Sequence, residues 1–240
     1  MPIFTRGDIS LYYEEQGKGF PLLMIAPGGM RSAVSFWEKA PWNPIPRLAA
    51  HYRVIAMDQR NAGQSKSPIR ATDGWHAYTE DQIALLDHLG VSRFHVAGMC
   101  IGGSYVMGLI QAAPERVVSA VMFQPIGVDG NRQAFLDMFD GWAKEQQAAH
   151  PEANGATWEA FKQNMYGSDF LFSVSRDFVK RCPTPLLVLL GNDLYHPQTT
   201  SREVASLAPN ATLIERWREP EHHEAAQATV ERFLAAYTPR

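Results

Sequence analysis

Short runs of consecutive apolar residues alternate along the chain with segments whose apolar positions recur every three or four residues. Runs of the first kind are typical of strands buried on both faces of a parallel sheet. They are PLLMIAP (21–27), RVIAMD (53–58), FHVAG (94–98), SAVMFQ (119–124) and PLLVLLG (185–191). Helical spacing marks residues 77–89, 102–113, 200–207 and 223–237. The alternation predicts an α/β fold with a mostly parallel central sheet flanked by helices.

Two further segments complete this outline. Ile9, Leu11 and Tyr13 alternate with polar residues before a Gly-Lys-Gly turn at 17–19, which predicts a hairpin between this segment and the run at 21–27.

Residues from about 126 to 180 interrupt the strand–helix rhythm and are rich in aromatic residues. We interpret them as a small helical lid inserted into one domain that covers residues 1–240, with at least half of the aromatic side chains serving as ordinary core.

Composition limits the classes of partner. Of the 240 residues, 45% are hydrophobic and 20% are charged, and the formal net charge is −3. The chain has no basic cluster, which argues against nucleic acid as a partner, and no leader-like start or long apolar run, which favours a cytoplasmic protein without a membrane span. We therefore expect reduced cysteines, no cofactor and a small-molecule partner. The pattern leaves the oligomeric state open, with a homodimer as one option.

The strongest chemical signal is GMCIGG (98–103), which follows an apolar run and opens a helical segment. A nucleophile in a sharp strand-to-helix turn needs small residues two positions away on either side, and Gly98 and Gly102 meet that need. The helix start also favours a thiolate. These features make Cys100 a candidate nucleophile, although a small buried cysteine in a glycine-rich turn is the plainer alternative.

Candidate partners follow Cys100 along the chain. Asp193 ends the run PLLVLLGND and is a candidate to orient an imidazole, with a turn cap as the alternative. His222 and His223 stand before the last helical segment, and we expect one of them, by preference His222, to be the base. A metal site that joins this pair to His196 or Asp193 is disfavoured, because adjacent histidines do not easily point at one ion.

An acyl-transfer site also needs two backbone N–H groups for the developing oxyanion. The residue after the nucleophile is Ile101. The second donor is expected in PGGM (27–30), with Gly29 as the first choice and Met30 as the second. The lid and the loops at the sheet supply candidate substrate-binding residues, namely Met99, Trp37, Phe139, Trp142, Phe161 and Tyr166.

Nearly the whole chain resembles the α/β-hydrolase superfamily, in its lidded esterase and lactonase branch. The resemblance rests on PLLMIAPGG, MDQRNAGQS (57–65), GMCIGG and CPTPLLVLLGND, in that order. Members usually carry serine where this chain has Cys100, and a cysteine there is similar to dienelactone hydrolase. The resemblance implies the α/β-hydrolase fold and a Cys–His–Asp triad.

Three functions fit these residues. The first is a hydrolase that cleaves an ester, lactone or thioester through an acyl-cysteine intermediate. The second is an acyltransferase that uses the same cysteine, and the third is a non-catalytic protein of the same fold that binds a small molecule. A redox-sensing thiol is a weaker fourth reading, because no resolving cysteine stands near Cys100 in the sequence.

Overall fold

The computed structural model describes residues 2–239 of the chain. Its strands are β1 (Ile3–Arg6), β2 (Ile9–Gln16), β3 (Phe20–Ile25), β4 (Tyr52–Met57), β5 (Phe94–Met99), β6 (Val117–Phe123), β7 (Leu186–Leu189) and β8 (Ala211–Ile214). Its helices are α1 (Ile45–Leu48), α2 (Trp75–His88), α3 (Ile101–Ala112), α4 (Arg132–Gln146), α5 (Gly155–Tyr166), α6 (Arg176–Lys180), α7 (Gln198–Leu207) and α8 (Pro220–Tyr237). Short 3₁₀ helices are η1 (Gly29–Arg31), η2 (Val34–Lys39) and η3 (Gln147–Ala149).

All eight strands form one sheet in the order β1-β2-β4-β3-β5-β6-β7-β8. The strands from β4 to β8 in this order run parallel to one another, and β1 and β2 are antiparallel at one edge. The inner parallel strands β3, β5, β6 and β7 are buried on both faces over most of their length, which explains their unbroken apolar runs, whereas β8 at the edge is partly exposed. The predicted α/β fold with a mostly parallel sheet is therefore confirmed.

The hairpin predicted around residues 17–19 is wrong. β2 pairs with β1 and with β4, whereas β3 lies between β4 and β5. The reason is the close passage of the turn over the start of β4. A Cβ atom on Gly17, whose φ is +76°, would lie 2.1 Å from the carbonyl oxygen of Ala49. The glycines allow the chain to cross toward the middle of the sheet instead of folding back along β2.

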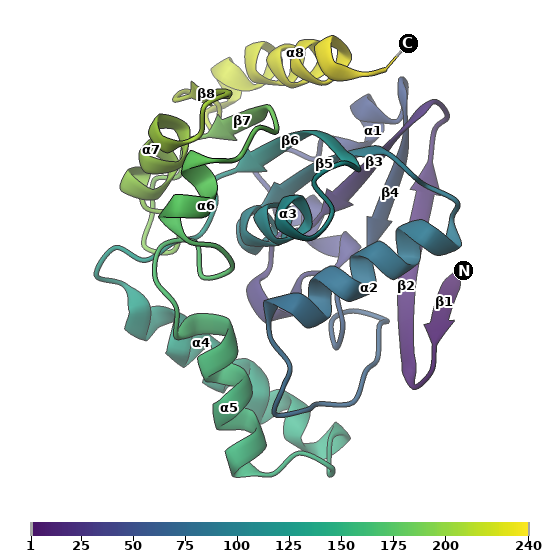
Figure 1. The fold of residues 1–240 in the computed structure, drawn as a ribbon, viewed down its shortest axis with the longest axis vertical. Helices are drawn as coiled ribbons and strands as arrows, with labels where there is room; N and C mark the ends of the chain where they lie inside the picture. The colour runs from purple at the N-terminus through teal and green to yellow at the C-terminus, as the bar shows by residue number, and fades with distance from the viewer. Residues whose placement is uncertain (1, 240) are drawn as a thin grey trace.

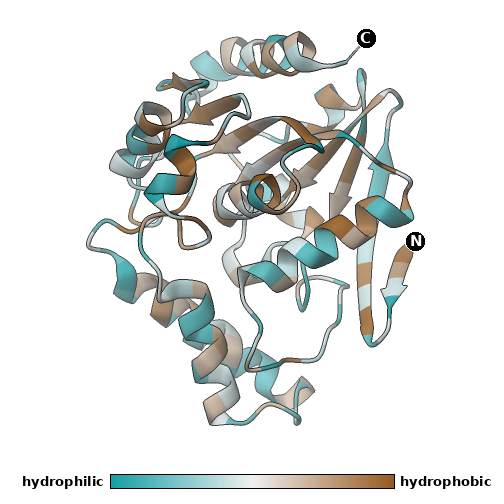
Figure 2. Ribbon diagram, in the orientation of Figure 1, coloured by the Kyte–Doolittle hydropathy of each residue, from teal (hydrophilic) through white to brown (hydrophobic). Residues whose placement is uncertain are grey.

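Helices cover both faces of the sheet (Figure 1). On one face α2, α3 and α7 contribute Leu85, Val106 and Val204 to the larger core cluster. On the other face α1 and α8 contribute Leu48 and Leu234 to a second cluster. Figure 2 shows hydrophobic residues concentrated in the strands and in α3. The two cores hold the sheet rigid, so the loops at its carboxyl edge are positioned precisely.

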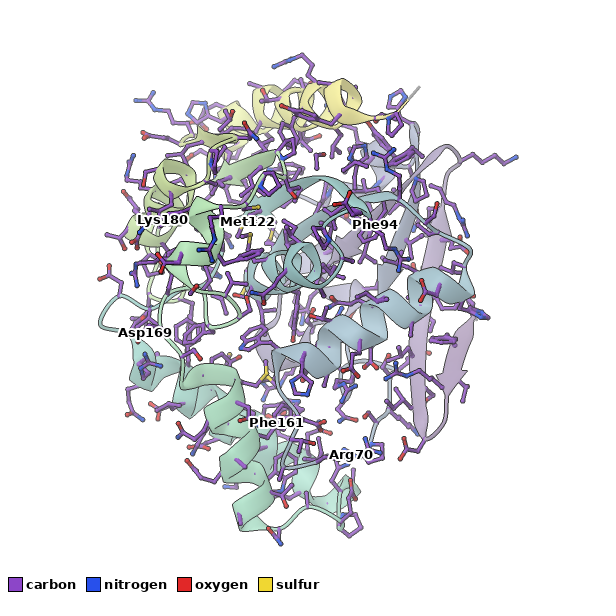
Figure 3. All side chains as sticks on the ribbon, viewed as in Figure 1. Arg70, Phe94, Met122, Phe161, Asp169 and Lys180 are labelled. Carbon is purple, nitrogen blue, oxygen red and sulfur yellow. The ribbon has the colours of Figure 1, made fainter. Side chains whose placement is uncertain are left out.

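The segment from 126 to 180 contains α4, η3, α5 and α6, and α4 and α5 form a layer below the sheet in Figure 1. Figure 3 places Phe161 in this layer, apart from Phe94 and Met122 in the body of the fold. Phe161 packs edge to face on Phe139 and Trp142 at centroid distances of 5.2 and 5.9 Å. The two helices thus have an aromatic core of their own.

Among residues 2–239, no helix is both long enough and apolar enough to span a bilayer.

Candidate active site

Cys100 occupies a sharp turn between β5 and α3. Its backbone has φ 61° and ψ −118°, a left-handed conformation that is costly for a residue with a side chain. A Cβ atom on Gly98 would lie 2.3 Å from the carbonyl oxygen of Gly102, and one on Gly102 would lie 2.8 Å from the carbonyl oxygen of Ile25, so both flanking positions require glycine. The N–H of Cys100 donates to Phe123 and the N–H of Gly103 donates to Cys100, each at 3.0 Å. These bonds hold the strained turn in place.

Two backbone N–H groups face the Cys100 thiol, those of Ile101 and Gly28. Ile101 was predicted as a donor. The second donor in the structure is Gly28 and neither of the two predicted residues. Gly29 lines the neighbouring cavity, and Met30, which belongs to η1, is buried in the larger core cluster. Gly28 has φ +122°, and this glycine-only geometry orients its own N–H toward the thiol.

His196 is the histidine that the structure brings to Cys100. Nδ1 of His196 lies 2.6 Å from Oδ1 of Asp193. The same carboxylate oxygen accepts the backbone N–H groups of Tyr195 and His196, each at 3.1 Å. Nε2 of His196 is buried, has no other partner among the residues that the structure describes, and lies beside the thiol. Asp193 and His196 thus form a compact turn after β7 that aims the imidazole at Cys100.

Other contacts fix this loop. Asn131 donates from its side chain to the carbonyl of Leu194 at 2.6 Å, and the N–H of Gly191 donates to the hydroxyl of Ser201 at 3.0 Å. A Cβ atom on Gly191 would lie 2.3 Å from the carbonyl oxygen of His196, so the loop closes tightly on itself. The close approach at Gly191 explains why this residue needs to be glycine.

The thiol and the imidazole shift each other's pKa. Burial raises the pKa of the Cys100 thiol, but the charge and contact of His196 together with the N–H groups of Gly28 and Ile101 bring it below the ordinary cysteine value. Burial lowers the pKa of His196, but Cys100 and Asp193 outweigh it and raise that pKa to about 9. Each charged form stabilises the other, so the contact favours thiolate and imidazolium over the neutral thiol and imidazole.

The hydrogen bond from His196 holds the pKa of Asp193 well below its usual range, although partial burial opposes this shift. Arg218 adds to the lowering. The carboxylate therefore stays ionised under all ordinary conditions and favours the protonated form of His196.

A cavity of about 250 Å³ lies in front of Cys100. Apart from the Cys100 and His196 side chains and the glycine backbone, its walls are aliphatic, thioether and aromatic side chains, and no Lys, Arg, Asp or Glu lines it within residues 2–239. The wall residues are Ile101, Ile126, Phe135, Met138, Tyr166 and Tyr195. A larger open groove of about 940 Å³ runs beside residues 61–68 and contains neither Cys100 nor His196. The smaller cavity is therefore the candidate active site.

The structure does not bring His222 or His223 to the thiol. Helix α8 begins at Pro220, earlier than the spacing indicated, so both histidines lie in its first turn. Nε2 of His223 donates to the carbonyl of Arg218 at 2.8 Å, and its ring lies 6.4 Å from that of Trp42. This position is on the side of the second core cluster and away from the cavity that contains His196.

Of the predicted substrate-binding residues, Tyr166 lines the cavity. The other five are buried elsewhere: Trp37 and Met99 in the second core cluster, and Phe139, Trp142 and Phe161 in the aromatic core of α4 and α5. The large aromatic side chains of α4 and α5 pack on one another to stabilise these two helices, and this explains why few of them face the cavity.

Sequence reasoning missed His196 and Gly28. The signal for His196 was available in Asp193-Leu-Tyr-His196, because an Asp that caps a turn brings the residue three positions later beside its carboxylate. Among the described residues, no group of three or more His, Cys, Asp or Glu side chains is arranged to hold a metal ion.

Comparison with known proteins identifies the family of the chain. Residues 21–191 match the α/β-hydrolase fold family, and the chain belongs to that family. A protein of Azorhizobium caulinodans with the provisional name carbamate hydrolase RutD is 42% identical over 147 residues, 60% of this chain and 46% of its own length. The 2-hydroxymuconate semialdehyde hydrolase of a Pseudomonas species is 33% identical over 115 residues, 48% of this chain and 39% of its own length. The chain thus spans less than half the length of these relatives.

Solved structures show the same fold over almost the entire chain. The enol-lactonase from Burkholderia xenovorans LB400 superposes with a TM-score of 0.72 and 19% identity, covering 98% of this chain and 100% of the other. A meta-cleavage product hydrolase from Pseudomonas fluorescens IP01 gives 0.70 and 21%, covering 96% of each chain. At this level of identity the likeness describes the fold alone.

Proposed function

We propose that the protein is a hydrolase of small, uncharged acyl compounds such as esters, lactones or thioesters, with Cys100 as nucleophile. The observation that carries the proposal is the arrangement of one strained cysteine beside His196, which is itself 2.6 Å from Asp193, at the wall of an apolar cavity. A nucleophile, a base and an orienting carboxylate in this relation are the parts that acyl transfer requires.

In the first step the Cys100 thiolate attacks the carbonyl carbon, and the electron pair of the C=O bond moves to the oxygen. The N–H groups of Gly28 and Ile101, which face the thiol at rest, are in place to stabilise the resulting oxyanion. His196 in its imidazolium form gives its proton to the leaving oxygen or sulfur as the tetrahedral intermediate collapses. The products are an alcohol or thiol and an acyl-cysteine.

In the second step neutral His196 takes a proton from water while the water oxygen attacks the thioester carbon. The second tetrahedral intermediate expels the Cys100 thiolate and releases the acid. The proton taken from water remains on His196, so the thiolate and imidazolium are restored. Asp193 keeps one tautomer of the imidazole and stabilises its charge in both steps.

The cavity supports the substrate class. A volume of about 250 Å³ fits an acyl group of modest size. A charged acyl chain finds no countercharge among the lining residues other than His196, and burial of an unpaired charge is costly. Residues 126–180 serve in this proposal as a lid that excludes water, because α4 and α5 supply Phe135, Met138 and Tyr166 to the cavity.

The test is intact-protein mass spectrometry within seconds of mixing with p-nitrophenyl acetate, p-nitrophenyl butyrate, an acetyl thioester and an unsaturated lactone. We expect a mass gain equal to the acyl group that maps to Cys100 and decays in water. Cys100→Ala removes it, whereas Cys182→Ser, at the other cysteine, retains it. An adduct that persists in water and is released by an added thiol or amine indicates an acyltransferase. Absence of an adduct with every substrate contradicts the nucleophile and favours a binding protein.

A further inference from the structure

Arg218 lies between β8 and α8, in the part of the chain where the sequence suggested a catalytic histidine. Its Nη1 donates to Oε1 of Gln124 at 2.7 Å and to Oδ2 of Asp193 at 3.3 Å. The other oxygen of Asp193, Oδ1, carries the hydrogen bond to His196. The two carboxylate oxygens therefore have different partners, one on the imidazole and one on the guanidinium.

Both ends of the Arg218 side chain are held. At the backbone, its carbonyl accepts the hydrogen bond from Nε2 of His223, and the preceding Trp217 is fully buried with its indole N–H on the carbonyl of Leu190 at 2.8 Å. At the tip, the acceptor Gln124 is buried, has φ +40°, and donates its N–H to the carbonyl of Leu189 at 2.8 Å. A strained side-chain-bearing residue at this position indicates that the surrounding structure fixes it.

Asp193 needs such support. It lies in a loop and 41% of its side chain is exposed. Oδ1 accepts hydrogen bonds from the imidazole and from the backbone N–H groups of Tyr195 and His196, so the freedom that is left to the carboxylate is rotation about Oδ1 with Oδ2 turned to water. A hydrogen bond on each oxygen removes that rotation and fixes the direction in which Oδ1 meets the imidazole. The contact joins the loop after β7 to the end of β6 and to the segment after β8.

We infer that Arg218 is a positioning residue, which orients the Asp193 carboxylate so that His196 stays beside the Cys100 thiol. The inference rests on the proposed roles of these three residues. Without Arg218, Oδ2 turns toward solvent about the anchored Oδ1 and the hydrogen bond from Oδ1 to the imidazole loses its alignment. The imidazolium then spends less time at the sulfur, and the thiolate loses stabilisation. The reactive thiol then ionises at higher pH.

The ionisable groups around the thiol allow a clean measurement. Besides His196, two titratable side chains, Tyr105 and Tyr166, lie near enough to Cys100 for its charge to raise their pKa. Both are buried, and burial raises the pKa of each phenol well above 10, so both stay neutral between pH 5 and pH 9. In the loop after β7, the charged group next to His196 is Asp193, and the charged group next to Asp193 is Arg218.

The experiment measures the rate at which iodoacetamide alkylates Cys100 between pH 5 and pH 9. Peptide mass spectrometry distinguishes this alkylation from that of Cys182. The unsubstituted chain is compared with Arg218→Gln, Arg218→Lys and Arg216→Gln. Arg216 is exposed and two residues away, so it controls for loss of a nearby positive charge. We expect the pH at which the alkylation rate is half-maximal, the midpoint, to rise by about half a pH unit in Arg218→Gln. Below this midpoint the alkylation rate should fall about threefold. Arg216→Gln keeps the original midpoint and Arg218→Lys gives an intermediate one.

An unchanged midpoint in a folded Arg218→Gln variant overturns the inference, as does an equal shift in Arg216→Gln. If Arg218→Gln fails to fold, Arg218→Lys decides: an intermediate shift supports the positioning role and an unchanged midpoint contradicts it. Alkylation needs no acyl substrate, so the result is independent of whether the protein hydrolyses any of the esters tested.

Discussion

Nδ1 of His196 lies 2.6 Å from Oδ1 of Asp193, which stands only three residues earlier in the same loop after β7. The orienting carboxylate and the imidazole therefore come from one turn rather than from two loops that meet in space. The loop after β8 supplies Arg218 to the carboxylate instead. One short turn thus sets the geometry of the pair that faces Cys100.

The first prediction concerns which histidine acts. His196→Gln should reduce turnover of the acyl-cysteine by about 10²- to 10⁴-fold, because general acid–base catalysis by a positioned side chain contributes that much. His222→Gln, at the exposed start of α8, is the matched control and should keep turnover within a factor of two. The steady-state rate of p-nitrophenolate release after the initial burst, followed by stopped flow, measures both. A large loss in His222→Gln with normal His196→Gln would instead support the histidine that the sequence favoured.

The second prediction is the pH dependence of the thiol. Since the pKa of Cys100 is lowered and that of His196 is raised to about 9, the reactive ion pair forms below the ordinary cysteine pKa of about 8.5 and persists to about pH 9. Acylation should rise as pH increases through the lowered thiol pKa and fall above pH 9, where the imidazolium proton needed by the leaving group is lost. A single rise centred on the ordinary cysteine value would contradict the ion pair.

The third prediction concerns the acyl group. Met138 of α4 is partly exposed and lines the cavity, and its Sδ lies 2.5 Å from where a Cβ atom on Gly29 would be. Met138→Ala should enlarge the cavity and raise the octanoate-to-acetate ratio of kcat/KM about tenfold, since a few methylene groups are worth that much in an apolar pocket. Leu136→Ala, on the same helix but outside the cavity, should leave the ratio unchanged. Equal ratios in both variants would show that another wall limits the chain length.

The fourth prediction concerns a buried charge network. Arg60 is 3% exposed and donates to Asp81 at 2.8 Å and to Asp73 at 3.1 Å. Arg60→Met removes the cation that the two buried carboxylates share, leaves Asp81 only the contact with Arg6 at 3.7 Å, and should lower the free energy of unfolding by about 3–5 kcal/mol. Urea denaturation at pH 7 measures the loss, and Arg216→Gln at the surface should change it by less than about 0.5 kcal/mol. A loss for Arg60→Met below about 1 kcal/mol would mean that the carboxylates are solvated or protonated without Arg60.

Local patterns of the sequence account for most of the fold. The unbroken apolar run of β5 and the glycines at 98 and 102 lead to a buried strand and a tight turn with Cys100 at its tip. These features depend on neighbours a few residues away, so they can be predicted without knowing the rest of the molecule. The misplaced hairpin at residues 17–19 shows the limit, because strand pairing depends on what the turn meets in space.

The sequence by itself determined the class of fold, the sharp strand-to-helix turn at Cys100 and the presence of Asp193 after β7. The tertiary structure decided which histidine reaches the thiol. Because α8 begins at Pro220, His222 and His223 lie away from Cys100. The turn capped by Asp193 places His196 beside the thiol instead. The tertiary structure also decided that Gly28 and not Gly29 or Met30 faces the sulfur, and that most aromatic side chains of residues 126–180 form a core. Distances between loops follow from how the sheet and helices pack, and no pattern of neighbouring residues encodes them.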